Sequence, residues 1–356
     1  MNSPLTLVTG ATGLLGNNVV RMLLDRGQPV RVLARETSDP RPLEGLDLDI
    51  VRGDVCDPDS VRRALEGVAR VIHSAGYVQI GLSGLDQHRK VNVEGTRHVA
   101  RAARAAGARL IHVSSCDAVG IGSLEKPADE ETPLNKPPRV PYVISKREAE
   151  QVVLEEVGRG LDAVIVNPAF MLGPWDWKPS SGRMLLEVGG GRGVLAPRGW
   201  FSLCDARDVA GGVLAAIDRG QTGRRYILAG VTMSYLEAWQ RFAKASGARR
   251  PWFRAGPVLL IAAGRSGDLS TRFTGHEPDV NSGAIALAAL PKSYSSKRAE
   301  TELGYRIRPT EETIRDAWAW FLEHGYVRRP QFRRKRVRPT VGAHGFPFGS
   351  RVTRSR

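Results

Sequence analysis

Tyr142 and Lys146 are the two residues whose types and spacing most directly suggest chemistry in this chain. Residues four positions apart on a helix share one face. An ammonium group beside a phenol favours the phenolate and is expected to lower the tyrosine pKa from about 10 towards neutral pH. Such a tyrosine can give a proton to a carbonyl or take one from an alcohol. Because this spacing also arises by chance in many helices, the prediction depends on further residues.

A serine hydroxyl is available to complete this pair. An apolar run that predicts a strand ends in Val113-Ser-Ser115. A hydroxyl at the end of that strand can hold the substrate oxygen while Tyr142 moves the proton. Ser115 is the predicted catalytic serine, and Ser114 stays open as the alternative.

The first sixteen residues predict a binding site for a dinucleotide. The apolar strand Leu5–Thr9 is followed by Gly10, Gly13 and Gly16. The first glycine permits a tight turn, the second lets the backbone approach a pyrophosphate, and the third lets a helix pack on the strand. Free amides at the start of that helix would face the phosphates. The order of strand, glycine turn and helix is the context that this motif requires.

The end of the second predicted strand, Val32-Leu-Ala-Arg35, bears on which dinucleotide binds. An NAD site usually has an acidic residue here that accepts a hydrogen bond from the ribose 2′-hydroxyl. The guanidinium of Arg35 can instead pair with a 2′-phosphate. The sequence therefore favours NADP(H), with NAD(H) as the alternative, and a surface arginine without a cofactor contact also stays open. Asp54 is expected at the adenine, and His73-Ser-Ala-Gly76 should let the backbone pass close to the cofactor.

The elements that must position these residues alternate through the first half of the chain. This alternation predicts an α/β protein with a Rossmann-type, doubly wound parallel sheet, whose strands end at one ligand-binding rim. The predicted strands are Leu5–Thr9, Val30–Leu33, Leu48–Arg52, Arg70–His73, Arg109–Ser114 and Ala163–Asn167. The predicted helices between them are Leu14–Arg26, Ser60–Leu65, Val93–Ala106 and Tyr142–Gly158.

The second half is less regular and predicts a smaller, discontinuous C-terminal substrate lobe. We expect residues 1–170 to form the dinucleotide-binding domain, with 205–230 returning to it, and residues 171–327 to form the lobe. Residues 328–356 are expected to be a basic, disordered tail. The predicted helices here are Ser181–Val188, Asp205–Asp218, Tyr235–Ser246, Ser296–Leu303 and Pro309–His324, and the predicted strand is Arg225–Leu228.

The net charge of +15 is concentrated in that tail. Residues 328–356 contain ten Arg or Lys and no acidic residue, and without them 42 basic residues face 37 acidic ones. No nucleic-acid partner is expected for the body of the protein, while weak contact of the tail with an anionic membrane stays open. The three cysteines are far apart, which suits reduced thiols in the cytoplasm and predicts no metal site.

One short apolar segment, Pro257–Ala263, is too short to span a bilayer. It predicts a buried helix, with a membrane-touching surface as the alternative. The expected location is therefore cytoplasmic, with a membrane-peripheral one left open.

The chain resembles the extended short-chain dehydrogenases/reductases, also called the NAD-dependent epimerase/dehydratase family. It is most similar to the dihydroflavonol 4-reductase-like branch, which includes a hopanoid-associated sugar epimerase group. The motifs that carry the resemblance are Thr9-Gly-Ala-Thr-Gly-Leu-Leu-Gly16, Gly53-Asp-Val55, Asn92-Val-Glu-Gly-Thr96, Val113-Ser-Ser115, Tyr142-x-x-x-Lys146 and Asn167-Pro-x-x-x-x-Gly-Pro174.

The resemblance implies a role for each matching residue. Ser115 would polarise the substrate oxygen, Tyr142 would act as acid or base, and Lys146 would bind the nicotinamide ribose and tune Tyr142. Asn92 would support this catalytic group, and Pro168 would cap the nicotinamide pocket. The full set expected to bind cofactor is Gly10, Thr12, Gly13, Leu14, Leu15, Gly16, Arg35, Asp54, Val55, Ser74, Ala75, Gly76, Tyr142, Lys146, Asn167, Pro168 and Ala169.

The substrate side is predicted from aromatic and polar residues near the same rim. Aromatic side chains suit an apolar or ring-shaped substrate, although each could equally serve packing. Trp175 and Trp177 are favoured because they share a loop rich in glycine and proline. Asp117 stands where members of the family usually have a small or hydroxyl residue. The candidates are Tyr77, Val78, Asp117, Phe170, Trp175, Trp177 and Trp200.

The leading functional hypothesis is an oxidoreductase that moves hydride between NADP(H) and a carbonyl or alcohol. One alternative is an NAD-dependent nucleotide-sugar epimerase or dehydratase, and another is a steroid- or hopanoid-type dehydrogenase at a membrane surface. A non-catalytic, cofactor-sensing regulator is disfavoured because such regulators typically lack the tyrosine and lysine. The expected partner is a small molecule, and a homodimer is left open.

Overall fold

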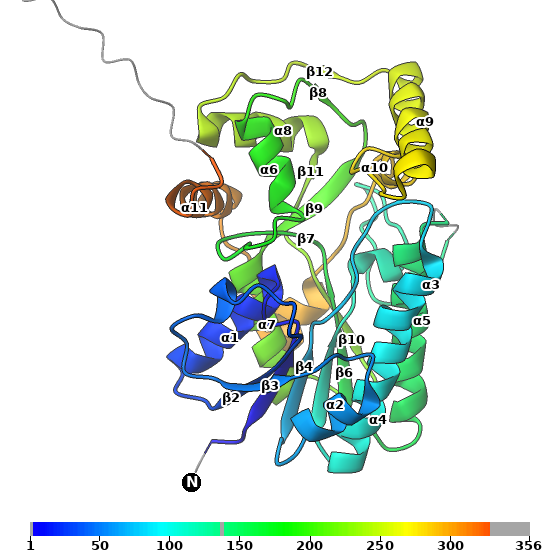
Figure 1. Cartoon of the computed structure of the whole chain (residues 1–356). Coiled ribbons are helices and arrows are strands. Elements are labelled where there is room, and N and C mark those ends of the chain that lie inside the picture. The colour runs from blue at the N-terminus through cyan, green and yellow to red at the C-terminus, as the bar shows by residue number, and fades with distance from the viewer. Residues whose placement is uncertain (1–2, 136–138, 328–356) are drawn as a thin grey trace, which may run out of the picture.

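The computed structural model describes residues 3–135 and 139–327. A seven-stranded sheet with the order β10-β6-β5-β4-β1-β2-β3 forms its centre, and every neighbouring pair of strands is parallel (Figure 1). The strands are β1 (Thr6–Thr9), β2 (Val30–Ala34), β3 (Asp49–Arg52), β4 (Arg70–His73), β5 (Arg109–Val113), β6 (Ala163–Pro168) and β10 (Arg225–Leu228). The predicted α/β class and parallel sheet are confirmed.

Helices cover both faces of this sheet, as a doubly wound fold requires (Figure 1). On one face α1 packs against α7, and their shared core includes Val19 and Val213. On the other face α4 packs against α2 and α5, around Val99 and Val153. The bounds are α1 (Leu14–Asp25), α2 (Pro58–Ala64), α4 (Gly95–Ala106), α5 (Pro141–Val157) and α7 (Ala206–Arg219).

Two predicted helices differ from the observed ones. The helix expected from Val93 begins earlier, with the short helix α3 (Leu85–His88) and the wider π-helical turn η2 (Arg89–Glu94) ahead of α4. The helix expected from Ser296 is reduced to a π-helical turn, η4 (Ala299–Leu303). In both places the hydrophobic pattern located an element, but it could not distinguish α-helical from wider turns.

The last strand of the central sheet comes from the second half of the chain. β10 pairs with β6, with Arg225 opposite Ile165. Together with α7 it places residues 206–228 against the sheet that the first half builds. The boundaries proposed at 170 and 327 stay a prediction.

The C-terminal lobe has a small core of its own. It holds a three-stranded sheet in the order β11-β9-β7, and α6, α8 and α11 surround it. Phe242 and Phe321 are fully buried between these elements. The bounds are β7 (Phe170–Leu172), α6 (Gly182–Gly189), β8 (Leu195–Ala196), β9 (Trp200–Asp205), β11 (Val231–Ser234), α8 (Tyr235–Ser246), β12 (Phe253–Arg254), α9 (Pro257–Thr274), α10 (Ser282–Ala288) and α11 (Thr310–Glu323).

The apolar segment at 257–263 begins α9, and the prediction that this helix is buried is wrong. Val258 is 79% exposed and Ile261 is 54% exposed, and the only buried residues of α9 are Gly264 and Gly267. The cause is that α9 packs chiefly against one short helix, α10, and lies at the outer edge of the lobe (Figure 1). Within the described residues, no helix is long and apolar enough to cross a membrane.

Candidate active site

The glycine turn lies at the carboxyl end of β1, in a position where side chains cannot fit. Gly10 has a φ of +72°, and a Cβ there would lie 2.6 Å from the backbone nitrogen of Ala75. A Cβ on Gly16 would lie 2.2 Å from the carbonyl oxygen of Gly10. The start of α1 carries no side-chain cap and no acidic residue in its first turn. Its backbone amides are therefore free of side-chain partners, which fits the pyrophosphate of a dinucleotide.

A hollow of about 370 Å³ lies beside the ends of β2 and β3, where the adenosine end of a cofactor would lie. Arg35 and Arg52 both line it, and Arg52 donates a hydrogen bond to the carbonyl of Arg35 over 3.4 Å. Arg52 is not among the predicted cofactor residues, although its place opposite Ala34 in the pairing of β2 with β3 is a signal that could have identified it. The other lining residues are Glu36, Thr37, Gly53, Asp54, Asp57 and Ser60.

The other predicted cofactor residues lie along the same edge of the sheet. Ser74 and Ala75 are tied to β1, because their backbone amides donate to the carbonyl and hydroxyl oxygens of Thr9, each over 3.2 Å. Val55 packs against Gly95 at the start of α4. Thr12, Leu14 and Leu15 belong to the glycine turn and the first turn of α1, while Pro168 and Ala169 follow from the end of β6.

On the nicotinamide side, Asn92 joins the loop after β4 to α5. Its side chain accepts a hydrogen bond from the amide of Tyr77 over 2.7 Å and donates to the carbonyl of Tyr77 over 3.0 Å. It also donates to the hydroxyl of Ser145 over 2.9 Å. A Cβ on Gly76 would lie 3.3 Å from the Asn92 oxygen and 3.5 Å from Nζ of Lys146. The structure therefore brings Gly76, Asn92 and Lys146 together at one edge of the site.

Ser115 and Tyr142 are both buried, and the Ser115 side chain lies close enough to Tyr142 to offset part of the effect of burial on its pKa. The Ser115 hydroxyl also accepts a bond from the amide of Asp117 over 3.2 Å, which fixes its orientation. Asn167 donates to the carbonyl of Ser115 over 2.9 Å, which ties the serine to β6. By contrast, Ser114 Oγ is buried without a partner among the described residues. The geometry favours Ser115 over Ser114 as the serine that works with Tyr142.

The expectation that Lys146 lowers the pKa of Tyr142 is not met in the structure. Burial raises the pKa of Tyr142 above its usual value, and the nearby Ser115 side chain offsets only part of this effect. Burial also lowers the pKa of Lys146 to about 8. The ammonium donates to the carbonyl of Val113 over 3.0 Å instead of facing the phenol. With a raised pKa, Tyr142 keeps its proton at neutral pH, which is the form that can donate a proton.

A buried ion pair next to Tyr142 was not foreseen. Lys292 Nζ lies 3.1 Å from the carboxylate of Asp117, with side chains 11% and 17% exposed. Burial alone would lower the pKa of Lys292, but the carboxylate of Asp117 keeps it above its usual value. Asp117 was a predicted substrate residue, whereas Lys292 lies in a loop whose sequence gives no sign of this contact. The backbone amide of Asp117 donates to the Ser115 hydroxyl, which places the pair next to the candidate site.

The aromatic candidates divide into two groups. Phe170 stacks edge-on with Phe201 at a centroid distance of 4.9 Å, and Phe201 lies 4.6 Å from Tyr235. Tyr77 stacks edge-on with His88 at 4.7 Å, next to the largely exposed Val78. Tyr77 and Val78 come shortly after β4, and Phe170 comes shortly after β6, so these candidates lie near strand ends at the rim of the sheet.

Trp175 and Trp177 were favoured as substrate contacts, but the structure gives them packing partners. Arg21 of α1 lies 3.4 Å above the Trp175 ring, and Trp177 stacks edge-on with Trp320 of α11 at 5.1 Å. The two indoles fill the junction between α1 and α11, which accounts for their presence in this loop. Trp200, another candidate, is half-buried on β9, where it pairs with Ser234 of β11. The geometry favours packing over substrate contact for these three residues.

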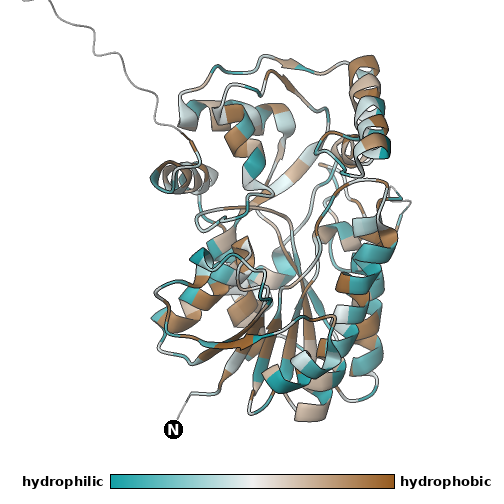
Figure 2. Ribbon diagram, viewed as in Figure 1, coloured by the Kyte–Doolittle hydropathy of each residue, from teal (hydrophilic) through white to brown (hydrophobic). Residues whose placement is uncertain are grey.

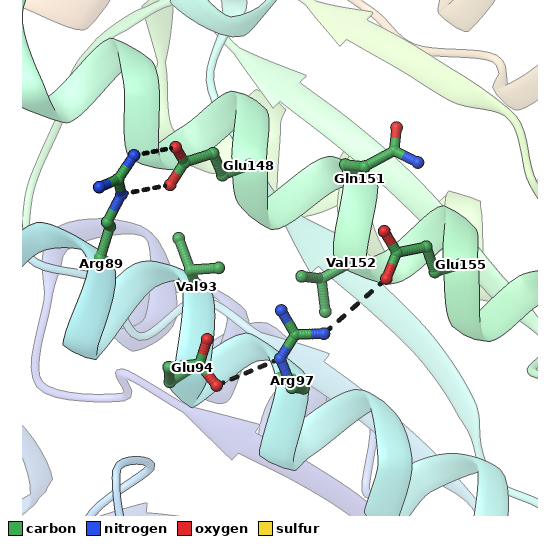
Figure 3. A pocket seen from close by; sticks show the side chains of 8 residues that line it. All are labelled: Arg89, Val93, Glu94, Arg97, Glu148, Gln151, Val152 and Glu155. Atoms are coloured by element: carbon green, nitrogen blue, oxygen red, sulfur yellow. Dashed lines mark hydrogen bonds and ion pairs between the residues drawn. The ribbon is translucent and has the colours of Figure 1, made fainter.

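A second hollow lies outside the site, between α5 and the η2–α4 segment (Figure 3). Ion pairs cross it, including Arg89 with Glu148 at 2.6 Å and Arg97 with Glu155 at 3.8 Å. None of the predicted cofactor or substrate residues lines it. It is a charged surface groove on the outer side of these helices.

The chain matches the family model described as the NAD dependent epimerase/dehydratase family over residues 6–229. It is 38% identical to sterol demethylase protein B of Methylococcus capsulatus, over 90% of this chain and 99% of that protein. It is 28% identical to 4-hydroxy-2-methyl-3-oxo-4-farnesyl-3,4-dihydroquinoline-1-oxide ketoreductase of Stigmatella aurantiaca, over 88% and 95%. Among solved structures, that of gox2253 superposes with a TM-score of 0.80 at 35% identity, over 92% of this chain and all of that one.

Proposed function

Because this chain belongs to the NAD-dependent epimerase/dehydratase family and is an NAD(P)-dependent oxidoreductase of the extended short-chain dehydrogenase type, we propose that it moves hydride between NADP(H) and a carbonyl or alcohol on an apolar, ring-containing molecule. The observation that carries this proposal is the buried group of Ser115, Tyr142 and Lys146, in which Lys146 lies one helical turn from Tyr142. This arrangement supplies a proton donor and an oxygen-binding hydroxyl at one point.

Each side chain has a distinct task in this proposal. The Ser115 hydroxyl holds the substrate oxygen, and Tyr142 donates its proton to that oxygen when a carbonyl is reduced. In the oxidation direction the same phenol receives the proton from the alcohol. Lys146 and Asn92 hold the nicotinamide ribose and the loop beside it. When bound, the reduced nicotinamide supplies the hydride.

The substrate class is inferred from the walls of the site and from the relatives. Phe170 is half-buried and offers an apolar ring backed by the buried rings of Phe201 and Tyr235. Asp117 and Lys292 offer one polar contact next to Tyr142. Two relatives are named for a sterol and for a farnesylated quinoline, both ring systems with large apolar parts. A largely apolar ring compound with an oxygen substituent matches both observations.

The preference for NADP(H) is supported by two guanidinium groups in the hollow beside β2 and β3. Arg35 and Arg52 can together neutralise a 2′-phosphate. Arg35→Asp should weaken NADPH binding by about 10- to 100-fold, corresponding to the loss of one or two charge-assisted hydrogen bonds, and leave NADH binding nearly unchanged. Fluorescence titration with both cofactors measures this difference. An equal loss of affinity for NADPH and NADH would show that Arg35 does not bind the 2′-phosphate.

The activity is tested with a panel of compounds and NADPH oxidation as the readout. Ketosteroids and polycyclic ketones should be turned over, and UDP-glucose should neither be consumed nor epimerised. Turnover of UDP-glucose with tightly held NAD would replace this proposal with the epimerase alternative. We also propose that the partner is a small molecule, that the protein is cytoplasmic and membrane-peripheral, and that it forms a homodimer. Light scattering measures the oligomeric state.

A further inference from the structure

Helix α9 packs through glycine and exposes its larger apolar side chains. A Cβ on Gly267 would lie 1.9 Å from the carbonyl oxygen of Val280, and one on Gly264 would lie 3.0 Å from the hydroxyl of Ser282. The helix is therefore held by close backbone approach on its inner side. This is the reverse of an ordinary surface helix, which buries its large apolar residues.

The outward side of α9 carries a continuous apolar stripe. Val258, Ala262, Leu269 and Phe273 recur at intervals of four and seven residues, so they share one helix face. Val258 is 79% exposed and Phe273 is 81% exposed. Figure 2 shows apolar turns of α9 at the outer edge of the molecule. We define the outer face as Val258, Leu259, Ile261, Leu269 and Phe273, which are all exposed, together with Arg265 and Arg272 of the same helix; Trp252 and Phe253 are exposed in the segment that precedes it.

Positive charge accompanies these apolar residues. Residues 249–274 contain five arginines and one acidic residue, Asp268. That carboxylate accepts a hydrogen bond from the amide of Ser282 and so helps to hold α10. Within residues 3–135 and 139–327, none of the five arginines forms an ion pair. The arginines are Arg249, Arg250, Arg254, Arg265 and Arg272, and all are exposed.

We propose that the outer face of α9 docks on a lipid bilayer that carries anionic headgroups. Exposed aromatic and aliphatic side chains can enter the boundary between headgroups and acyl chains, while arginines pair with lipid phosphates. The basic tail at 328–356 is poorly suited to cover this face, because it would bring ten further positive charges onto a positive surface. A second copy of the same face would meet the same repulsion.

This face also stands close to the catalytic group. α9 rests on α10, and Leu287 of α10 packs with Tyr142 and Val143. Gly283 of α10 contacts Gly81 in the loop after β4, and Asn281 donates to the carbonyl of Ile80 over 2.7 Å. One helix therefore separates the membrane-docking surface from the tyrosine. A substrate dissolved in the bilayer would meet the enzyme on the side nearest its active site.

The test is sedimentation of the full chain with vesicles of phosphatidylcholine, with or without 30% phosphatidylglycerol. The parent should bind the mixed vesicles more tightly than the neutral ones, and added salt should weaken this binding. The double variant Val258→Ser/Phe273→Ser should lose at least tenfold in affinity. Arg265→Gln/Arg272→Gln should lose severalfold on mixed vesicles only.

Control variants change exposed residues of the same kinds on other parts of the molecule. Ile50→Ser/Leu124→Ser and Arg62→Gln/Arg63→Gln should bind vesicles like the parent. NADPH affinity, measured for every variant, reports whether the fold is intact. If the α9 variants bind like the parent, or the parent binds no vesicle, the proposal is overturned. A parent dimer that dissociates in Val258→Ser/Phe273→Ser would assign the face to a second copy instead.

Discussion

Helices α5 and α9 are almost equal in length, and each begins with a proline at its first turn. They nevertheless lie in opposite surroundings. Ten of the seventeen residues of α5 are buried, including Tyr142 and Lys146. Only two of the eighteen residues of α9 are buried, and both are glycine.

The difference comes from the elements that each helix packs against. α5 lies against α4, η2, the turn after β5 and the sheet itself, whereas α9 has α10 as its main neighbour. The helix propensities of the two segments cannot reveal this, because burial is a property of the neighbours. The comparison shows that α5 is a buried support for the candidate site, whereas α9 leaves most of its side chains exposed. The following experiments would sharpen or break that contrast, beginning with the largest effect.

Tyr142→Phe removes one hydroxyl from the buried helix α5. This change should lower kcat by about 10²- to 10⁴-fold, the usual contribution of a general acid. NADPH affinity should stay within about twofold, since Lys146 and the glycine turn are untouched. Stopped-flow reduction of a ketone found in the panel gives kcat, and fluorescence gives the affinity. Tyr226→Phe is the control, because its hydroxyl bonds Glu302 away from the site. Normal turnover in Tyr142→Phe would remove this residue as the acid.

Gly267→Ala and Gly211→Ala make the same change in two helices with opposite expected results. A Cβ at Gly267 collides with the Val280 carbonyl, so the free energy of unfolding should fall by about 1–3 kcal/mol. A Cβ at Gly211 of α7 meets no atom within 4 Å, so stability should rise by up to about 1 kcal/mol. Urea unfolding measures both. Equal tolerance at the two positions would show that backbone contact does not hold α9.

The smallest effect concerns pH and Lys146. Its pKa is lowered from 10.5 to about 8 in the folded protein. Between these pH values the unfolded chain binds more protons than the folded one, so this residue makes the free energy of unfolding rise with pH. Lys146→Met should flatten the rise between pH 8 and 10, and Arg265→Met on α9 should leave it unchanged. Urea unfolding across this pH range makes the comparison, and an unaltered slope in Lys146→Met would contradict the lowered pKa.

The sequence predicted the central sheet and the catalytic group because both follow local patterns. Each strand of the first half has an apolar run of its own, and parallel connections bring the ends of those strands to one rim. Ser115 follows one of these runs, and Tyr142 and Lys146 share a helix, so their meeting needed no knowledge of distant segments. The roles assigned to them remain a prediction.

Features that depend on distant segments could not be predicted in this way. Lys292 reaches Asp117 across 175 positions of sequence, and nothing in its loop distinguishes it from a surface lysine. Trp175 and Trp177 lie in a loop whose composition resembles a binding loop, but α11, which comes more than a hundred residues later, supplies their partners. The exposure of α9 likewise depends on how few elements of the lobe pack against it.

The ion pair between Asp117 and Lys292 has a consequence for how the protein is made. When the ribosome has produced the first 230 residues, all seven strands of the central sheet and the whole Ser115, Tyr142 and Lys146 group have been synthesised. Asp117 at that stage has no lysine beside it, and its carboxylate must stay in water. Only the emergence of Lys292 allows that charge to be buried. The residues of the candidate site are thus encoded early along the chain, while the partner that lets Asp117 be buried comes late.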